Sequence, residues 1–419
     1  MERSRSDVLI MGGGVIGLSC ALYLLKAGAS VRVLEQDTPG SGSSHGNCGT
    51  ITPSHAGPLT MPGMVGTALR SMLRKDAPLY VNPRPDPERA RWLLGFARHC
   101  TWRDYQLAGE ARGAILARSR SLIGELVASD ELDCEFEDVG ELYVYRDERT
   151  LQRDRPHVEL LHRLGMEVRV LLGDDVLALE PALREGVVGG LLHPGDARLR
   201  PDRYVAELAR RVRELGGAIE TGARVDSFVT DGARITHVRT TGGVFSGERV
   251  VMALGAWSPL VSKLLDIRLP MQPGKGYSLT WTQPPVNAPT HSLVLREAAV
   301  CVTPWTSGYR LGSTMEFSGF AEGLNDVRLQ ALRRGAAAYL HEPEGQGEVT
   351  PWWGWRPMSV DELPIIGPSA RWSNLVYATA HGMLGISMSA ATGELVASLL
   401  AGPAPTLDAA PYTPARFAL

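Results

Sequence analysis

Four glycines near the N-terminus are spaced as a dinucleotide-binding turn requires. The segment Gly12–Gly17 reads GGGVIG and satisfies the pattern G-x-G-x-x-G. Gly12 permits a tight turn, Gly14 lets the backbone approach a pyrophosphate, and Gly17 lets a helix pack closely on a strand. The free N–H groups at the start of that helix then point toward the anion. The pattern alone is weak, so its meaning depends on its surroundings.

The surrounding residues supply the expected elements. Apolar spacing predicts a strand at Asp7–Met11, a helix at Val15–Ala27 and a second strand at Val31–Glu35. Glu35 stands 21 residues after Gly14, where a carboxylate accepts hydrogen bonds from ribose hydroxyls and repels a 2′-phosphate. The alternative is a tight turn beside an exposed glutamate. The combination of turn, helix and carboxylate favours a dinucleotide site.

The rest of the chain predicts a second dinucleotide-type region and a strand-rich insertion. Helices are expected at 89–129, 157–164, 201–215, 327–339 and 390–400, and strands at 140–145, 218–221, 224–230, 234–240, 248–253, 276–282, 309–312 and 375–378. This order indicates an α/β plus α+β protein with a discontinuous, Rossmann-like domain and an inserted mixed or antiparallel substrate domain. We expect the first domain to comprise residues 1–60, 196–260 and 351–419, and the second 61–195 and 261–350.

Length, net charge and cysteine content argue against several classes of function. With 419 residues, the chain is long enough for two domains, and its net charge of −3 gives no reason to expect a nucleic acid or an acidic membrane surface as partner. Its five cysteines form no CxxC motif or Cys/His cluster, which argues against a disulfide framework and a metal site and suits a reducing compartment. The apolar run Val8–Leu25 contains four glycines, which would break a membrane-spanning helix.

The glycine turn does not by itself distinguish FAD from NAD. Val250–Trp257 contains a buried strand that ends at Gly255, and another glycine turn, at His381–Gly385, precedes the last predicted helix. Several separate turns that converge on one ligand suit the long, extended FAD. An NAD-dependent dehydrogenase is the alternative.

Several segments together resemble one family of flavoenzymes. They are Gly12–Gly17, Gly42–Gly49, Pro273–Ser278, Trp355–Gly367 and His381–Ile386, in that order along the chain. Their order is similar to that in D-amino-acid dehydrogenases, a branch of the family that also contains D-amino-acid oxidase, glycine oxidase and sarcosine oxidase. The resemblance spans residues 7 to 400. It implies noncovalent FAD with its ring at the domain interface and the substrate between the ring and a sheet of the second domain.

The resemblance also implies the residues that surround the cofactor. Ser43 and Ser44 would lie by the pyrophosphate and ribityl chain, and Val225 by the adenine. The turn at Gly382–Ile386 would place N–H groups and a helix N-terminus at the pyrimidine end, where positive partial charge stabilises reduced flavin. The candidate cofactor-binding residues are Gly12, Gly14, Val15, Ile16, Gly17, Glu35, Gln36, Ser43, Ser44, Asn47, Gly49, Val225, Ala253, Gly255, Trp257, Gly382, Met383, Leu384, Gly385 and Ile386.

Three residues are candidates for the reaction itself. By resemblance, Arg356 pairs with the substrate carboxylate, since a planar guanidinium holds a carboxylate through two parallel hydrogen bonds. A structural arginine stacked on Trp352, Trp353 or Trp355 is the alternative. Tyr277 could add a hydroxyl to the same carboxylate or be a strand tyrosine, and His45 could hydrogen-bond the flavin or be structural. Some relatives bind flavin covalently through a nearby histidine, but His45 is one position off that pattern, and Gly354 replaces the cysteine used by others.

These residues predict an FAD-dependent oxidation of a small amino acid, which we expect to be a D-amino acid. Hydride transfer from Cα to flavin N5 would give an imino acid that hydrolyses to a 2-oxo acid, as in amino-acid catabolism. Secondary amines and glycine-type substrates, such as D-proline, D-hydroxyproline, sarcosine and glycine, remain open, as does a flavoprotein subunit of an electron-transfer complex. The electron acceptor would be a quinone, another carrier or oxygen. We expect a cytoplasmic protein, with peripheral association at the inner membrane face as the alternative.

Overall fold

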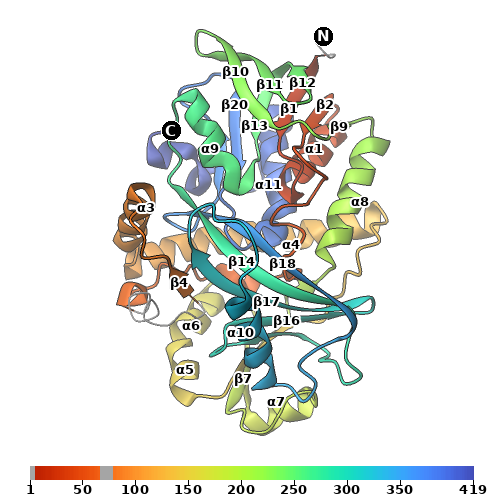
Figure 1. The fold of residues 1–419 in the computed structure, drawn as a ribbon, viewed down its shortest axis with the longest axis vertical. Coiled ribbons are helices and arrows are strands. Elements are labelled where there is room, and N and C mark those ends of the chain that lie inside the picture. The colour runs from red at the N-terminus through yellow and green to blue at the C-terminus, as the bar shows by residue number, and fades with distance from the viewer. Residues whose placement is uncertain (1–4, 67–78) are drawn as a thin grey trace.

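The computed structural model describes residues 5–66 and 79–419. A six-stranded sheet occupies the upper part of the molecule (Figure 1). Its order is β19 (Ile365–Pro368), β20 (Leu375–Thr379), β13 (Gly247–Met252), β1 (Ser6–Met11), β2 (Val31–Leu34) and β9 (Ala218–Glu220). All neighbours are parallel except β19 and β20. A parallel sheet of short apolar strands at the glycine turn confirms the expected dinucleotide fold.

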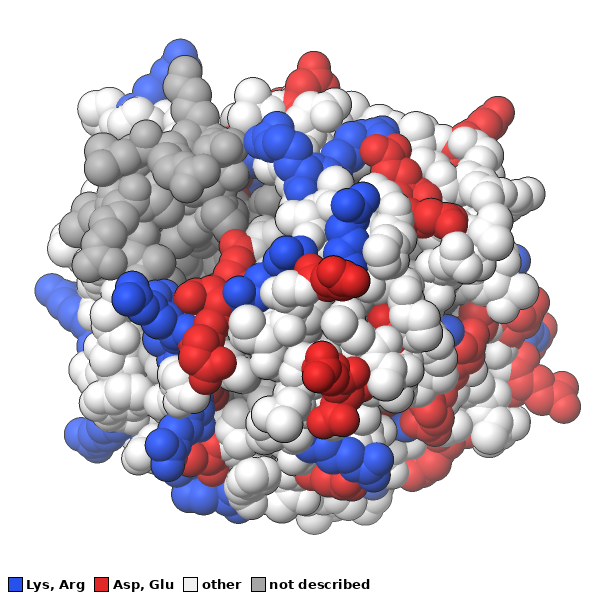
Figure 2. Space-filling view, turned by 90° about the horizontal axis from the view of Figure 1, so that it is seen from below, with Lys and Arg blue, Asp and Glu red and all other residues white. Residues whose placement is uncertain are grey.

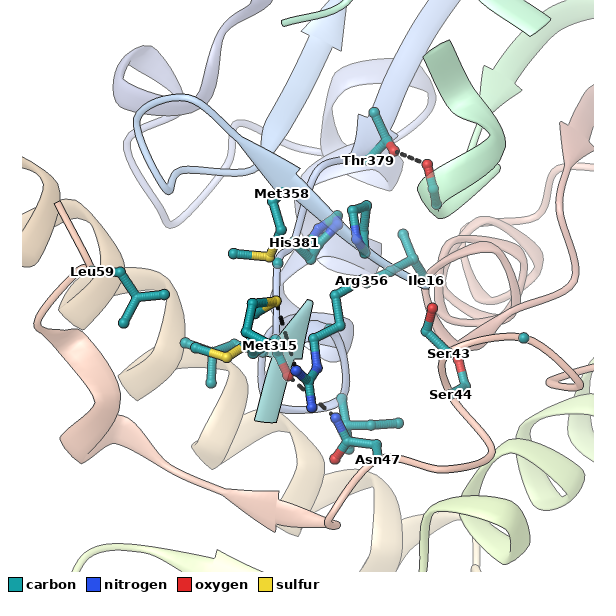
Figure 3. Close-up of a pocket in the computed structure, with 18 of the residues that line it drawn as sticks. Ile16, Ser43, Ser44, Asn47, Leu59, Met315, Arg356, Met358, Thr379 and His381 are labelled. Atoms are coloured by element: carbon teal, nitrogen blue, oxygen red, sulfur yellow. Dashed lines mark hydrogen bonds between the residues drawn. The ribbon is translucent and has the colours of Figure 1, made fainter. Parts of the chain in front are cut away.

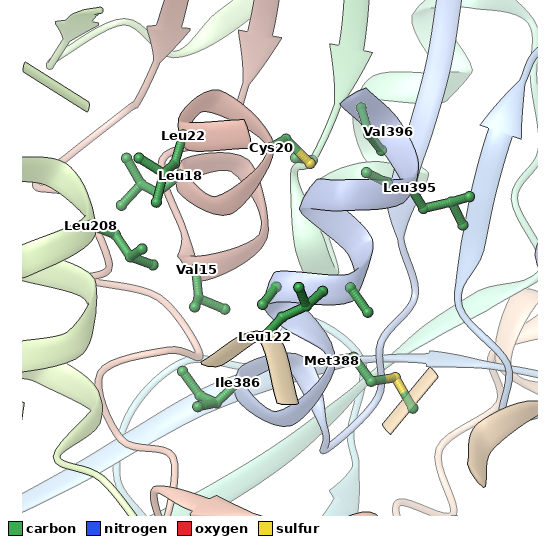
Figure 4. Packing of buried hydrophobic residues seen from close by; sticks show 14 of the residues in the cluster. Val15, Leu18, Cys20, Leu22, Leu122, Leu208, Ile386, Met388, Leu395 and Val396 are labelled. Carbon is green, nitrogen blue, oxygen red and sulfur yellow. The ribbon is translucent and has the colours of Figure 1, made fainter. Parts of the chain in front are cut away.

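Four helices pack beside this sheet and form the largest apolar core (Figure 4). They are α1 (Val15–Lys26), α4 (Trp102–Ser129), α8 (Pro201–Glu214) and α11 (Gly385–Leu400). Helix α1 is apolar on nearly all sides because it is enclosed by the sheet and by other helices. Gly393 lets α11 approach α1, since a Cβ there would lie 2.7 Å from the Ser19 carbonyl oxygen. This contact holds the middle of α11 against the middle of α1.

A nine-stranded sheet forms the lower part of the molecule (Figure 1). Its order is β18 (Gln346–Ser359), β14 (Met271–Gln283), β17 (Gly308–Phe317), β16 (Val300–Trp305), β15 (Ser292–Leu295), β5 (Glu141–Tyr145), β7 (Gly189–His193) and β6 (Arg169–Leu172), and β4 (Leu79–Val81) pairs with β17. Most pairs are antiparallel, whereas β15–β5 and β17–β4 are parallel. The sheet is therefore mixed, as expected.

Smaller elements complete the fold. β10 (Val225–Asp231), β11 (Arg234–Thr240) and β12 (Gly243–Phe245) form a three-stranded sheet, and β3 (Thr50–Ile51) pairs with β8 (Ala197–Arg198). Further α-helices are α3 (Pro87–Arg98), α5 (Glu148–Arg153), α6 (Arg155–Arg163), α7 (Gly173–Leu179), α9 (Ser258–Ser262) and α10 (Asp326–Ala337).

Several elements differ from the sequence prediction, since strands such as β7, β15, β16 and β19 were not predicted. Two further differences have a clear physical reason. The helical region expected at 89–129 is two helices, because Thr101 caps α4 by accepting a hydrogen bond from the Asp104 N–H at 3.1 Å. Strand β18 was not predicted as a strand, since it contains Pro351 and Pro357. It lies at an edge of the sheet, where prolines are tolerated.

The two sheets draw on different parts of the chain. All six strands of the upper sheet fall within 1–60, 196–260 and 351–419, whereas the lower sheet uses 61–195 and 261–350, except that β18 continues past residue 351. None of the helices in the described ranges is long and apolar enough to span a membrane. On the lower face, basic and acidic side chains are interspersed (Figure 2).

Candidate active site

A cavity of about 1010 Å³ is lined by residues from both sheets. Its wall includes the glycine turn after β1, the loop 40–50, strand β17, the end of β18 and the turn before α11. Ligand cavities typically measure about 300–1,000 Å³, so this one has the size needed for a large ligand.

The glycine turn adopts the conformation that dinucleotide binding requires. Gly12 has a φ of +107°, and a Cβ there would lie 2.4 Å from the Ala253 carbonyl oxygen. A Cβ on Gly17 would lie 1.9 Å from the Gly12 carbonyl oxygen, so only glycine lets α1 pack against this turn. Gly14 begins α1 with no side-chain cap, and the first turn has no acidic residue. The helix N-terminus is thus available to a phosphate.

Glu35 directly follows strand β2 and lies beside the glycine turn. It lines the cavity, and its carboxylate accepts hydrogen bonds from the Gly13 N–H at 2.7 Å and the Asp37 N–H at 3.0 Å. Burial raises the pKa of this carboxyl. Backbone amides hold the carboxylate beside the glycine turn, where a ribose hydroxyl would reach it. The helix N-terminus, the glycines and Glu35 therefore fit the adenosine and pyrophosphate parts of FAD.

The structure brings most of the expected cofactor-binding residues to the cavity. All of them line it except Gly17 and Gly49. Gly49 has a φ of +78°, and a Cβ there would lie 2.2 Å from the Leu199 carbonyl oxygen. A glycine at this position therefore lets the loop pack against Leu199. Ser44 Oγ accepts the Val15 N–H at 3.1 Å.

The turn before α11 forms the opposite wall. Gly382–Ile386 all line the cavity, and Gly385 begins α11, whose first turn contains no acidic residue. His381 Nε2 lies 2.9 Å from Thr392 Oγ1, and burial lowers the pKa of this imidazole to about 3. His381 is therefore neutral near pH 7.

Arg356 extends from β18 into the cavity (Figure 3). Its Nη1 donates to the Thr314 carbonyl oxygen at 2.5 Å and lies 3.8 Å from Met315 Sδ. Within residues 5–66 and 79–419, no carboxylate forms an ion pair with this guanidinium and no tryptophan ring stacks on it. Burial lowers the pKa of Arg356. A half-buried guanidinium without an acidic partner is suited to an anionic ligand.

Glycines under Arg356 make room for its side chain. A Cβ on Gly276 of β14 would lie 2.5 Å from Arg356 Cζ. In the antiparallel register Gly274 is opposite Arg356, and Gly276 is opposite Gly354. Gly274, Gly276 and Arg356 therefore share one face of the sheet.

Tyr277 and His45 lie outside the cavity. Tyr277 alternates with Gly276 and faces the other side of β14, where it packs in the core of the lower sheet and donates its hydroxyl to Glu316 at 3.0 Å. His45 has an exposed side chain, although its carbonyl accepts a hydrogen bond from Arg310 at 3.0 Å. The structure thus brings Arg356, but neither Tyr277 nor His45, to the cofactor residues.

An apolar wall beside Arg356 was not predicted from the sequence. Met315 lies beside the guanidinium, whereas Met358 and Leu59 lie farther from it in the same cavity (Figure 3), which Phe96 and Phe317 also line. These residues come from a loop, β17, β18 and α3, and no local motif links them. Alternation along β17 and β18 could have indicated Met315, Phe317 and Met358, but not the other two.

Comparison with known proteins identifies the family. The family described as DAO, FAD dependent oxidoreductase, matches residues 7–399. The chain belongs to this family of FAD-dependent oxidoreductases. It is 33% identical over 416 residues to a D-amino acid dehydrogenase of Bradyrhizobium diazoefficiens, covering 98% of this chain and 99% of that protein. A D-amino acid dehydrogenase of Rhizorhabdus wittichii is also 33% identical, over 96% of this chain and 97% of its own length.

Solved structures share the fold. Glycine oxidase from Geobacillus kaustophilus superposes with a TM-score of 0.78 at 24% identity, covering 98% of both chains. L-proline dehydrogenase from P. horikoshii superposes with a TM-score of 0.77 at 19% identity, covering 99% of this chain and 98% of that one. The expected family, fold class and use of FAD are thereby confirmed.

Proposed function

We propose that this protein is a dehydrogenase or oxidase of D-amino acids, with Arg356 as the residue that binds the substrate carboxylate. The observation that carries the proposal is that the Arg356 guanidinium, in the same cavity as the dinucleotide turn, has no acidic partner among residues 5–66 and 79–419. The names of the relatives that share a third of the sequence support the same substrate class.

Arg356 would orient the substrate as well as bind it. The bond from Nη1 to the Thr314 carbonyl fixes one edge of the guanidinium and leaves other N–H donors for the ligand. A carboxylate held at two points can rotate little, so the Cα–H bond keeps one direction toward the cofactor. When bound, FAD supplies a two-electron acceptor for the hydride from Cα. The product is an imino acid, which hydrolyses in water to a 2-oxo acid and ammonia.

The protein side of this reaction needs little acid–base chemistry. The amine must be neutral as the hydride leaves, and a poorly solvated site lowers the pKa of an ammonium group. Met315 beside Arg356, and Leu59 and Met358 elsewhere in the cavity lining, provide such surroundings. His381 is neutral, so it adds no positive charge that would oppose the loss of hydride with its electron pair. It also adds no negative charge that would stabilise the ammonium form of the substrate amine.

The apolar wall also points to the side chain of the substrate. Leu59, Phe96 and Met315 contribute hydrocarbon and thioether surface, which favours an apolar side chain over a charged one. We therefore propose D-amino acids with medium-sized apolar side chains as preferred substrates. Glycine, sarcosine and D-proline analogues fit the same carboxylate site and form the second class to be tested.

We propose that FAD is bound without a covalent link. His45 lies outside the cavity, and Gly354 occupies the position of the linking cysteine in some relatives. Acid precipitation of the purified protein should release all flavin into the supernatant. Flavin that stays with the precipitate would contradict this proposal.

The electron acceptor and cellular location are also proposals. The dehydrogenase relatives support a quinone or another carrier in place of oxygen, with the protein in the cytoplasm or loosely bound at the inner membrane face. The five free cysteines suit a reducing compartment. Consumption of oxygen at the same rate as reduction of a dye acceptor would instead indicate an oxidase.

A screen of steady-state turnover tests the proposed function. Purified protein is assayed with an artificial dye acceptor against D- and L-amino acids, glycine, sarcosine and proline analogues, and ammonia and 2-oxo acid are measured. We expect equal amounts of both products from apolar D-amino acids. A yellow protein that turns over none of these substrates would favour a subunit of an electron-transfer complex.

A further inference from the structure

Two cysteines line the cavity beside Arg356. Cys48 comes from the loop before β3, and Cys301 comes from β16 of the lower sheet. Both are free cysteines, and each residue is of intermediate burial. The reaction described above uses neither of them.

The sheet register places these two sulfur atoms close together. Cys301 is directly opposite Gly312 on the neighbouring strand β17. A Cβ on Gly312 would lie 2.6 Å from Cys48 Sγ, so the Cys48 sulfur occupies the space above Gly312. Residues directly opposite in antiparallel strands have Cβ atoms about 4.5–5.5 Å apart. The Cys48 sulfur therefore lies next to the Cys301 side chain, on the cavity side of the sheet.

The surroundings make the two thiols chemically unequal. A side-chain hydrogen bond with Cys301 lowers the pKa of the Cys48 thiol, and the positive charges of Arg356 and Arg310 lower it further, against the effect of burial. The same hydrogen bond and burial raise the pKa of Cys301. A thiol with a lowered pKa next to a second thiol is the arrangement found in cysteine pairs that oxidise to a disulfide.

We propose that Cys48 and Cys301 form a reversible disulfide in the presence of a peroxide and thereby switch off the Arg356 site. The Cys48 thiolate attacks one peroxide oxygen, breaks the O–O bond and becomes a sulfenic acid, and the other oxygen leaves as hydroxide or alkoxide. The Cys301 sulfur, having lost its proton, then attacks the Cys48 sulfur and displaces hydroxide, which takes up a proton to become water. The two sulfurs lose two electrons in total, and the peroxide gains them.

The other three cysteines do not have these features. Cys20 and Cys134 are buried in the main apolar core, and burial is the main cause of the raised pKa of each thiol. Cys100 lies after α3, outside the lining of the cavity. Selective oxidation at Cys48 and Cys301 is therefore expected.

Thiol counting and peptide mapping test this proposal on the FAD-loaded protein. After mild treatment with hydrogen peroxide, wild type should lose two of its five thiols, and digestion without reductant should yield a linked peptide pair containing Cys48 and Cys301. Turnover should fall together with the thiol count, and dithiothreitol should restore both. Dithiothreitol does not reverse methionine oxidation, so recovery distinguishes the disulfide from general damage.

Variants and a second probe separate the pair from single thiols. Cys301→Ser should form no linked peptides and should leave a sulfenic acid on Cys48 that dimedone traps, whereas Cys100→Ser should behave like wild type. Phenylarsine oxide, which bridges two neighbouring thiols with loss of water, should protect two thiols of wild type and none beyond background in Cys301→Ser. Five intact thiols after peroxide, a disulfide that links another pair, or no arsenical uptake by wild type would overturn the proposal, whether or not the variants fold.

Discussion

Replacement of Arg356 is the most informative perturbation of the site. Its Nη1 is engaged by the Thr314 carbonyl at 2.5 Å, so the remaining N–H groups are those available to a carboxylate. Truncation of one partner in a buried charge pair costs about 2–5 kcal/mol. Arg356→Ala should therefore lower kcat/KM for amino acids by roughly 30- to 5,000-fold. Arg356→Lys keeps the charge but loses the second parallel hydrogen bond, worth about 1.5–3 kcal/mol, and should lose about 10- to 150-fold.

Steady-state kinetics with a dye acceptor measure these effects, and the visible flavin spectrum reports cofactor content. Both variants should keep FAD, because Arg356 belongs to β18 of the lower sheet, whereas Gly12–Gly17 and Glu35 follow β1 and β2 of the upper sheet. Arg371→Gln is a matched control, since this arginine is 53% exposed and pairs with Asp266 outside the cavity. It should match wild type.

Substrates with and without a carboxylate distinguish a carboxylate-binding role of Arg356 from a structural one. An amine that lacks the carboxylate should be a poor substrate of wild type and should react equally poorly with Arg356→Ala. If the variants lose less than threefold with amino acids, the carboxylate binds elsewhere. If they lose activity equally on both kinds of substrate, Arg356 supports the structure of the cavity instead.

Three further changes test other parts of the account. Gly276→Ala places a Cβ 2.5 Å from Arg356 Cζ, so kinetics should show up to about 100-fold lower kcat/KM at unchanged FAD content. Glu35→Ala removes a charged hydrogen-bond acceptor, and flavin-fluorescence titration should show a Kd for FAD about 10- to 150-fold higher. Burial keeps the pKa of His193 well below 6.5, so below that pH the unfolded state takes up a proton that the folded state does not, and acid destabilises the fold. The free energy of unfolding, measured with urea, should therefore fall by about 2 kcal/mol less between pH 7 and pH 5 for His193→Leu than for wild type. The matched variant His162→Leu, at an exposed position, should show the same fall as wild type.

Local patterns were enough to predict the cofactor end of the site. Gly12, Gly14 and Gly17 perform local tasks, namely a turn, an open approach and a close contact within one β–α unit, so their spacing carries their meaning. Glu35 follows from the same unit. The pairing of β1 with β2 also follows from the helix α1 that connects them.

The substrate end depends on pairing between distant strands. Gly276 and Tyr277 are neighbours in sequence, but the pleat of β14 turns Gly276 toward Arg356 and Tyr277 into the opposite core. A shift of one residue in register would reverse these faces, and nothing local fixes the register. The proximity of Cys48 and Cys301 likewise depends on the absence of a side chain at Gly312.

Anaerobic reduction of the bound flavin tests the central claim most directly. The FAD-loaded protein is mixed with an apolar D-amino acid without oxygen or any acceptor, and the visible absorbance is followed in wild type and Arg356→Lys. We predict complete bleaching of wild type, at least tenfold slower bleaching of the variant, and formation of one 2-oxo acid per flavin. A wild-type flavin that stays oxidised with every amino acid, while dithionite reduces it, would contradict the account.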